Sequence, residues 1–96
     1  MASETTRDSV RSVERALTIL QCFTLDESAL TLMEIARKMD LPMSTTVRIV
    51  STLQKMGFLD RNGDKTYSLG SRAYSVGCVA RARRKHSIFW KARRDW

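Results

Sequence analysis

The amino-acid sequence predicts one small, mainly helical domain that carries a β-hairpin. Three observations predict this fold class. Apolar residues repeat at helical spacing in three consecutive segments, and a short break, Asp40–Pro42, separates the second segment from the third. A turn-forming pair, Asn62-Gly63, then lies between two short segments with strand-forming residues. With 96 residues, 43% of them hydrophobic, the chain can build a single core but not two.

Residues 12–23 are predicted to form the first helix, after an arm at residues 1–11 that is expected to be disordered. An apolar stripe follows the i, i+3, i+4, i+7 spacing of a helix and consists of Val13, Ala16, Leu17 and Leu20. Ser12 suits the N-cap position. Further apolar residues widen the arc, which indicates deep burial or a partner helix; they are Ile19, Cys22 and Phe23.

The second helix begins at a capping box in the segment Thr31-Leu32-Met33-Glu34, with Thr31 as the N-cap. It should end near Asp40, because Pro42 disfavours helical geometry at Leu41. Pro42 is then well placed to open the next helix, where its missing N–H group costs nothing.

The third helix is predicted over residues 42–56, with Gly57 as a left-handed stop. Two strands are predicted near residues 58–61 and 65–69. They should be joined at Asn62-Gly63, because both residues tolerate positive φ angles.

A further helix is expected to begin at residues 71–80, although Gly77 weakens it. The order of helix, helix, short turn, helix and hairpin is that of a winged helix-turn-helix, a three-helix core plus a wing. The domain is therefore expected to span residues 12–70, and residues 81–96 are expected to form a separate basic tail.

The outward face of the third helix has the composition of a DNA-binding surface. Placing residues 100° apart puts one face inside the domain, formed by Thr46, Ile49, Val50 and Leu53. The opposite face consists of Ser44, Arg48, Ser51 and Lys55. No carboxylate occurs between Pro42 and Gly57. DNA presents a dense row of phosphates, so cations and hydroxyls suit this face whereas an acid would be costly.

The N-terminal part of the third helix is expected to enter the major groove of double-stranded DNA. The predicted groove-facing residues are Met43, Ser44, Thr45, Val47 and Arg48. Arg48 could bind a guanine edge or a phosphate, and Val47 could contact only a thymine methyl. Further predicted DNA-binding residues are Thr31, Ser51, Lys55, Arg61 and Lys65. For the last two, which flank the hairpin tip, simple solvation of a turn explains the charges nearly as well.

The net charge of +7 is not evidence for specific DNA binding, because the last sixteen residues carry +6 of it. Cys22 and Cys78 form no CxxC pair and are expected to be buried or half-buried apolar residues. With His86 as the only histidine, no metal or cofactor site is expected, and no enzymatic nucleophile or paired carboxylate is recognisable. No apolar run is long enough to span a membrane, and no signal peptide is recognisable, so a cytoplasmic protein is expected.

Five segments in register carry a family resemblance: SVERALTIL at 12–20, TLMEIA at 31–36, LPMST at 41–45, GFL at 57–59 and YSLG at 67–70. They resemble the N-terminal domain of the isocitrate lyase regulator (IclR) family of bacterial transcription factors, over roughly residues 12–80. The resemblance implies a winged helix-turn-helix that binds operator DNA as a dimer, with residues 42–56 as the recognition helix. It also implies a larger effector domain that binds small molecules, and this domain is expected to be absent from residues 1–96.

The sequence departs from the family pattern in the recognition helix, at Thr46 and Val47, and again in residues 81–96. Thr46 takes the place of an apolar branched residue, and its buried hydroxyl is expected to bond the Pro42 carbonyl. Val47 takes the place of a polar residue, so the operator preference should differ. Residues 81–96 show no family resemblance. They are either a truncated or frame-shifted end or a basic-aromatic tail that attracts phosphates or an anionic membrane.

The sequence therefore predicts a transcriptional regulator that binds specific double-stranded DNA, and a homodimer through the first helix is one option. Two alternatives stay open. The wide apolar arc of the first helix suits a winged-helix module that binds another protein. The basic residues after Ala80 suit non-specific nucleic-acid binding.

Overall fold

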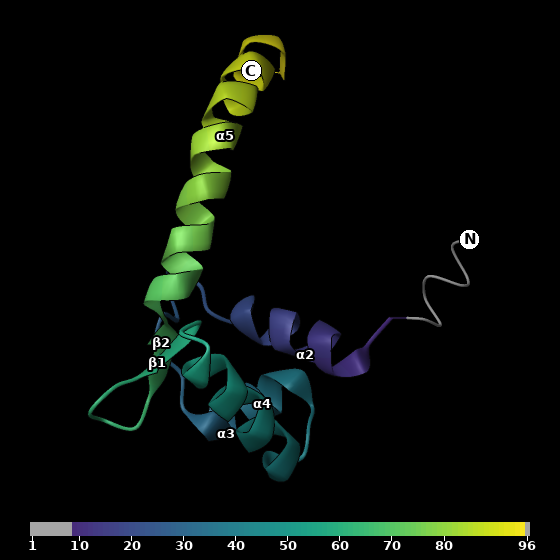
Figure 1. Ribbon diagram of the computed structural model, residues 1–96, viewed down its shortest axis with the longest axis vertical. Coiled ribbons are helices and arrows are strands. Elements are labelled where there is room, and N and C mark those ends of the chain that lie inside the picture. Colours follow the sequence, from purple (N-terminus) through teal and green to yellow (C-terminus); the bar gives the residue numbers. More distant parts are fainter. Residues whose placement is uncertain (1–8, 96) are drawn as a thin grey trace.

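A computed structural model describes the backbone of residues 9–95 and the side chains of residues 9–84. The elements are α2 (Arg11–Leu20), α3 (Leu32–Met39), α4 (Met43–Lys55), β1 (Leu59–Arg61), β2 (Tyr67–Leu69) and α5 (Ser71–Asp95). The first three of these helices and the hairpin pack into one body, from which α5 projects (Figure 1). The predicted fold class, mainly helical with one hairpin, is confirmed. The predicted arm lies largely outside the described residues.

The hydrophobic core contains at least one side chain from each element of the body. Its most deeply buried apolar residues, each at most 2% exposed, are Ile19, Leu30, Ile35, Val50 and Leu59. They come from α2, the connection after it, α3, α4 and β1 in turn. Burying each such side chain stabilises the fold by about 1.5–3 kcal/mol. The shared core thereby fixes α4 against the other elements.

Helix α2 starts one residue earlier and ends three residues earlier than the sequence predicts. Val10 is the N-cap and its carbonyl accepts from the N–H groups of Val13 and Glu14, both at 3.0 Å, so Ser12 is not the cap. At the other end the N–H of Cys22 bonds the Ile19 carbonyl at 3.0 Å, which tightens the last turn. The chain then leaves the helix axis and buries Phe23 in the core.

The predicted capping box of α3 is confirmed. The Thr31 hydroxyl accepts from the Glu34 N–H at 3.1 Å, and the Glu34 carboxylate accepts from the Thr31 N–H at 2.8 Å. The helix ends at Asp40, which adopts a left-handed conformation with φ 55° and lets the Leu41 N–H bond the Ala36 carbonyl at 3.0 Å. The tight turn of a helix-turn-helix thus depends on Asp40 as well as on the proline.

Two glycines join the end of α4 to the end of the hairpin. Gly57 has φ 85°, and the following N–H, that of Phe58, bonds the Leu53 carbonyl at 2.8 Å, as the predicted left-handed stop requires. Gly70 lies against it so closely that a Cβ atom there would come within 2.5 Å of the Gly57 carbonyl oxygen. This contact sets the position of β2 and of α5 relative to α4.

The hairpin forms as predicted but closes through a different turn. Its strands pair antiparallel, with Arg61 opposite Tyr67, and Leu30 bridges to the outer side of β2 through Tyr67. The left-handed residue is Lys65, with φ 69°, so the predicted positive φ angles at Asn62-Gly63 are wrong. The Asp64 carboxylate accepts from the Thr66 hydroxyl at 2.6 Å and from the Thr66 N–H at 3.2 Å. These bonds lower the pKa of Asp64 and hold the wider loop.

Helix α5 is longer than predicted and continues through Gly77, where an added Cβ would meet nothing within 4 Å. Cys78 on this helix is exposed, which corrects the prediction that it is buried or half-buried. Cys22 is half-buried as predicted, and burial raises the pKa of its thiol. In the part of the chain that the structure describes, none of the helices combines the length and apolar character that crossing a membrane requires.

Candidate nucleic-acid interface

Helix α4 has one buried and one exposed face, divided as the sequence predicts. Three of the predicted inward residues are almost fully buried: Thr46, Val50 and Leu53. The fourth, Ile49, is half-buried and faces α2. The predicted outward residues are all exposed and lie on one face: Ser44, Arg48, Ser51 and Lys55. The predicted groove-facing set is also accessible, since Met43 and Val47 are exposed and Thr45 is half-buried at the side that faces α2.

The first turn of α4 is fixed by a hydrogen bond that the sequence predicts. The Thr46 hydroxyl donates to the Pro42 carbonyl at 3.0 Å, and the Thr46 N–H donates to the same oxygen at 3.0 Å. In the part of the chain that the structure describes, no buried side-chain nitrogen or oxygen lacks a partner. The buried hydroxyl of Thr46 is therefore satisfied.

The cations of this surface have no acidic partner among the described residues. The one ion pair there joins Lys38 to Glu27 at 2.6 Å, and this contact raises the pKa of Lys38. Arg48 and Lys55 on α4 are thus not neutralised by a neighbouring carboxylate. An unpaired guanidinium or ammonium on a face without acids is suited to bind phosphate.

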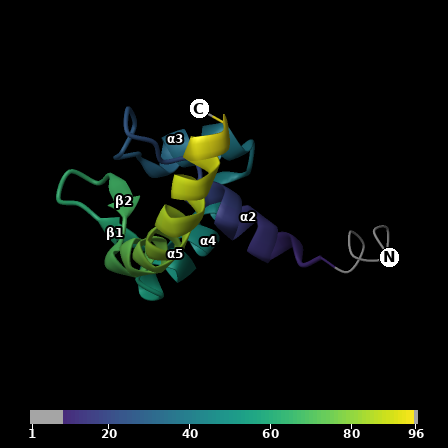
Figure 2. The same cartoon turned by 90° about the horizontal axis from the view of Figure 1, so that it is seen from above.

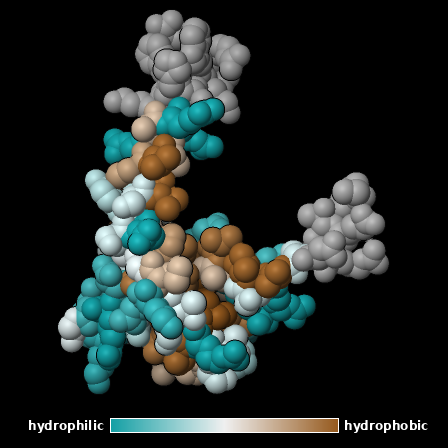
Figure 3. Space-filling model, viewed as in Figure 1, coloured by the Kyte–Doolittle hydropathy of each residue, from teal (hydrophilic) through white to brown (hydrophobic). Residues whose placement is uncertain are grey.

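The hairpin brings two further predicted residues beside α4. Arg61 ends β1 and Lys65 lies in the loop, and both are exposed. The hairpin and α2 lie on opposite sides of α4 in both views (Figures 1 and 2). Hydrophilic side chains gather on the hairpin side of the body (Figure 3). The wing thus presents its charges on one flank of α4.

Thr31 is the predicted residue that the structure uses most clearly for another purpose. It is half-buried, and its hydroxyl oxygen accepts the capping bond from Glu34. A hydroxyl that accepts still carries its own proton, which it can donate to a phosphate. The cap is thus compatible with a contact at the start of α3.

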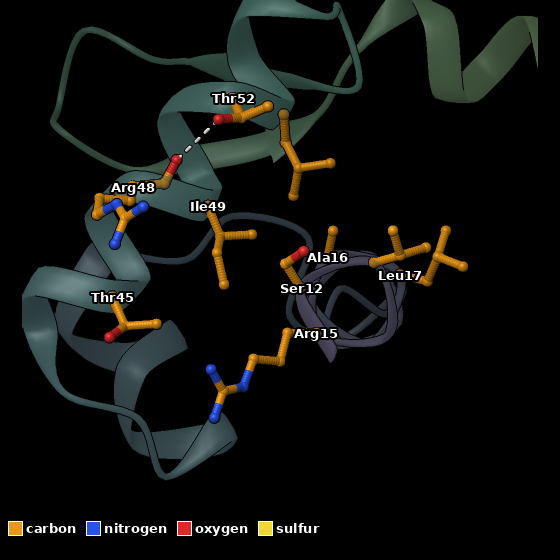
Figure 4. A pocket seen from close by; sticks show the side chains of 10 residues that line it. Ser12, Arg15, Ala16, Leu17, Thr45, Arg48, Ile49 and Thr52 are labelled. Carbon is orange, nitrogen blue, oxygen red and sulfur yellow. Dashed lines mark hydrogen bonds between the residues drawn. The ribbon is translucent and has the colours of Figure 1, made fainter. Parts of the chain in front are cut away.

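A groove of about 440 Å³ lies between α2 and α4 (Figure 4). Its α2 side is formed by Ser12, Val13, Arg15, Ala16 and Leu17, and its α4 side by Thr45, Arg48, Ile49, Thr52 and Leu53. The Thr52 hydroxyl donates to the Arg48 carbonyl at 3.0 Å, the bond drawn in Figure 4. The sequence analysis missed Arg15, because its place depends on how α2 crosses α4 and no periodicity within α2 contains that.

The described residues contain no group of three or more His, Cys, Asp or Glu side chains placed to hold a metal ion. The candidate surface consists of the hydroxyls and cations around α4, a composition that suits a polyanion.

Comparison with known proteins identifies relatives of this chain. The family model described as the IclR helix-turn-helix domain matches residues 12–63. The transcriptional repressor IclR of Escherichia coli (strain K12) is 33% identical over 69 residues, 71% of this chain and 25% of the repressor. The regulator KipR of Bacillus subtilis (strain 168) is 37% identical over 60 residues, 62% of this chain and 24% of that protein.

Solved structures give the same likeness. An IclR family transcriptional regulator from Brucella abortus superimposes with a TM-score of 0.73 at 32% identity, over 79% of this chain and 29% of that one. An IclR homolog from Microbacterium hydrocarbonoxydans, solved in complex with 4-hydroxybenzoate, gives a TM-score of 0.65 at 32% identity, over 68% of this chain and 27% of that one. The chain thus spans about a quarter of the length of the curated relatives it matches.

Proposed function

The chain belongs to the IclR helix-turn-helix family, and from this premise we propose that it regulates transcription by binding specific sequences in double-stranded DNA. One observation carries the proposal. The exposed face of α4 presents Arg48, Lys55 and several hydroxyls, and no carboxylate occurs between Pro42 and Gly57. A helix with that face, held at its back by a buried core, can lie in the major groove.

The proposed contacts divide into base-reading and phosphate-binding groups. The base-reading group lies in the first half of α4 and consists of Met43, Ser44, Thr45, Val47 and Arg48. The phosphate-binding group surrounds it and consists of Thr31, Ser51, Lys55, Arg61 and Lys65. Arg48 gives the largest single contribution, because a guanidinium can bind a guanine edge through two hydrogen bonds. Val47 offers a methyl surface that suits thymine.

We also propose that two copies of the chain bind one operator, in contact through α2. Val13 and Leu17 are 53% and 54% exposed on that helix, one turn apart, and a second copy that packs there would bury both. Two copies read two half-sites about 34 Å apart on one face of the duplex. The unit that binds DNA is proposed to be residues 12–70, with α5 beginning as a linker. The site of action is the cytoplasm, where bacterial chromosomes lie.

The proposal is tested by selection from a randomised duplex library with the full 96-residue chain. We expect a recurring sequence to be enriched, and Arg48→Ala to weaken binding to that duplex about 10- to 100-fold. Arg37→Ala is the matched control, because Arg37 is also an exposed arginine but lies near the end of α3. This change should have little effect on the affinity for the selected duplex. A library without enrichment, together with unchanged affinity in Arg48→Ala, would refute the proposal.

Two observations favour alternatives that the same experiment separates. Exposed arginines on α5, among them Arg81 and Arg83, suit non-specific binding to any nucleic acid. In that case all duplexes bind alike. Exposed Val13 and Leu17 suit a protein partner instead of a second copy. Sedimentation of the chain with and without Leu17→Asp distinguishes self-association, which this change should abolish, from a monomer that needs another partner.

A further inference from the structure

From the groove between α2 and α4 we infer that Arg15 is an additional DNA contact, a cation that binds a phosphate on the α2 flank of the recognition helix. The inference rests on the proposed function. It adds a contact from a helix outside the helix-turn-helix, on the side of α4 opposite the wing.

The geometry of the groove directs Arg15 toward α4. Its side chain leaves α2 and extends toward Thr45, while Arg48 extends from the neighbouring turn of α4 (Figure 4). Thr45 is one of the groove-facing residues of the proposed function. Arg15 and Arg48 therefore line the same groove, so a phosphate that enters it beside Thr45 can be contacted from α2 as well as from α4.

The groove carries positive charge that no acidic side chain in its lining neutralises. Its ten lining residues include two arginines and no acid. Within the described part of the chain, Arg15 has no carboxylate within ion-pair distance, since the pair recorded there is Lys38 with Glu27. Two like charges in one groove repel each other and favour an anion between or beside them.

The half-buried state of Arg15 makes it a better contact than a free surface cation. Its side chain lines the groove together with apolar residues such as Ala16 and Ile49, and part of it is covered while part stays accessible. A side chain already restricted in this way loses less conformational entropy when it binds a phosphate. A guanidinium can also bind two phosphate oxygens at once.

A structural role is the competing explanation, since the stem of Arg15 could act only by covering the groove wall. The two explanations differ in salt dependence. A stem that packs affects the melting temperature but not the number of counterions released from DNA. A phosphate contact contributes about one unit to the slope of log affinity against log salt concentration.

The test measures affinity of the full chain for the selected duplex and for an unrelated duplex across salt concentrations. For Arg15→Gln we expect affinity to fall about 3- to 10-fold on both duplexes, with the slope reduced by about one. Arg15→Lys keeps the charge and should keep the slope. Arg83→Gln, the same change on α5, is the matched control and should leave affinity and slope nearly unchanged. Melting curves establish that each variant is folded.

Each outcome decides the inference. An unchanged slope in Arg15→Gln overturns it while leaving the proposed function intact, provided that Arg48→Ala still weakens binding to the selected duplex. An equal loss of affinity and slope in Arg83→Gln overturns it as well, because the effect would then follow from the net charge of the protein and not from the position of Arg15. If Arg15→Gln does not fold, a slope reduced by one in folded Arg15→Lys also overturns it. An unaltered chain that binds neither duplex refutes both the inference and the proposed function.

Discussion

Helices α4 and α5 both expose cations, but only α4 is packed along its length against the core. The inner face of α4 is anchored by Val50 and Leu53, so the helix that carries Arg48 and Lys55 is held in one position relative to the body. Helix α5 has more basic residues, yet it projects from the body and its described side chains beyond Ala73 are exposed. The comparison teaches that the placement of charge, not its amount, makes a candidate surface for reading DNA sequence.

The largest effect is expected when the contact that fixes α4 against the hairpin is disturbed. Gly70→Ala places a Cβ atom 2.5 Å from the Gly57 carbonyl oxygen, so backbone must shift. We expect a loss of about 1–3 kcal/mol in the free energy of unfolding, by the cost of overpacking. Urea denaturation followed by circular dichroism measures it. An unchanged midpoint would mean that the two glycines do not set the position of β2.

A smaller effect is expected at the first turn of α4. Thr46→Val keeps the buried shape but removes the hydroxyl that donates to Pro42. The Pro42 carbonyl keeps its bond from the N–H of residue 46. We therefore expect the free energy of unfolding to fall by only about 0.5–1.5 kcal/mol. Denaturation under the same conditions measures it. A loss as large as that in Gly70→Ala would show that the hydroxyl organises more of α4 than its first turn.

The smallest effect is expected on α5. Gly77→Ala adds a Cβ atom into open space on a helix, which should stabilise α5 locally by about 0.5–1 kcal/mol. Because α5 projects from the body, the melting temperature of the core should not change, while helical ellipticity should rise. A clear rise in the melting temperature of the core would contradict the view that the part of α5 around Gly77 does not stabilise the body.

The sequence predicted α4 well because its information is local. The buried face of α4 repeats apolar residues with the 3.6-residue period of a helix. Thr46 lies four residues after Pro42, so the Pro42 carbonyl is the nearest acceptor for its hydroxyl. The hairpin turn was wrong because Asp64 and Thr66 bond each other and outweigh the preference of Asn62-Gly63. The length of α5 was underestimated because one glycine costs only about 1 kcal/mol.

The positions that the sequence missed or predicted wrongly depend on tertiary packing. Arg15 lies off the apolar stripe of α2 and looks like a solvated residue until α2 is placed across α4. Cys78 was expected to be at least half-buried because cysteine usually is, but α5 has no partner there within the described chain. Such positions follow from how elements cross and end, which residue spacing within one element does not contain.

The central claim, that fixed cations on α4 and not the charge of α5 select DNA, is tested most directly by two charge-removal variants. One carries Arg48→Gln and Lys55→Gln, and the other carries Arg81→Gln, Arg83→Gln and Arg84→Gln, so it loses more charge. Both are measured by anisotropy against the selected duplex and an unrelated one. We expect the α4 variant to bind both duplexes alike and the α5 variant to keep its preference. Loss of preference in the α5 variant, with the α4 variant unaffected, would contradict the claim.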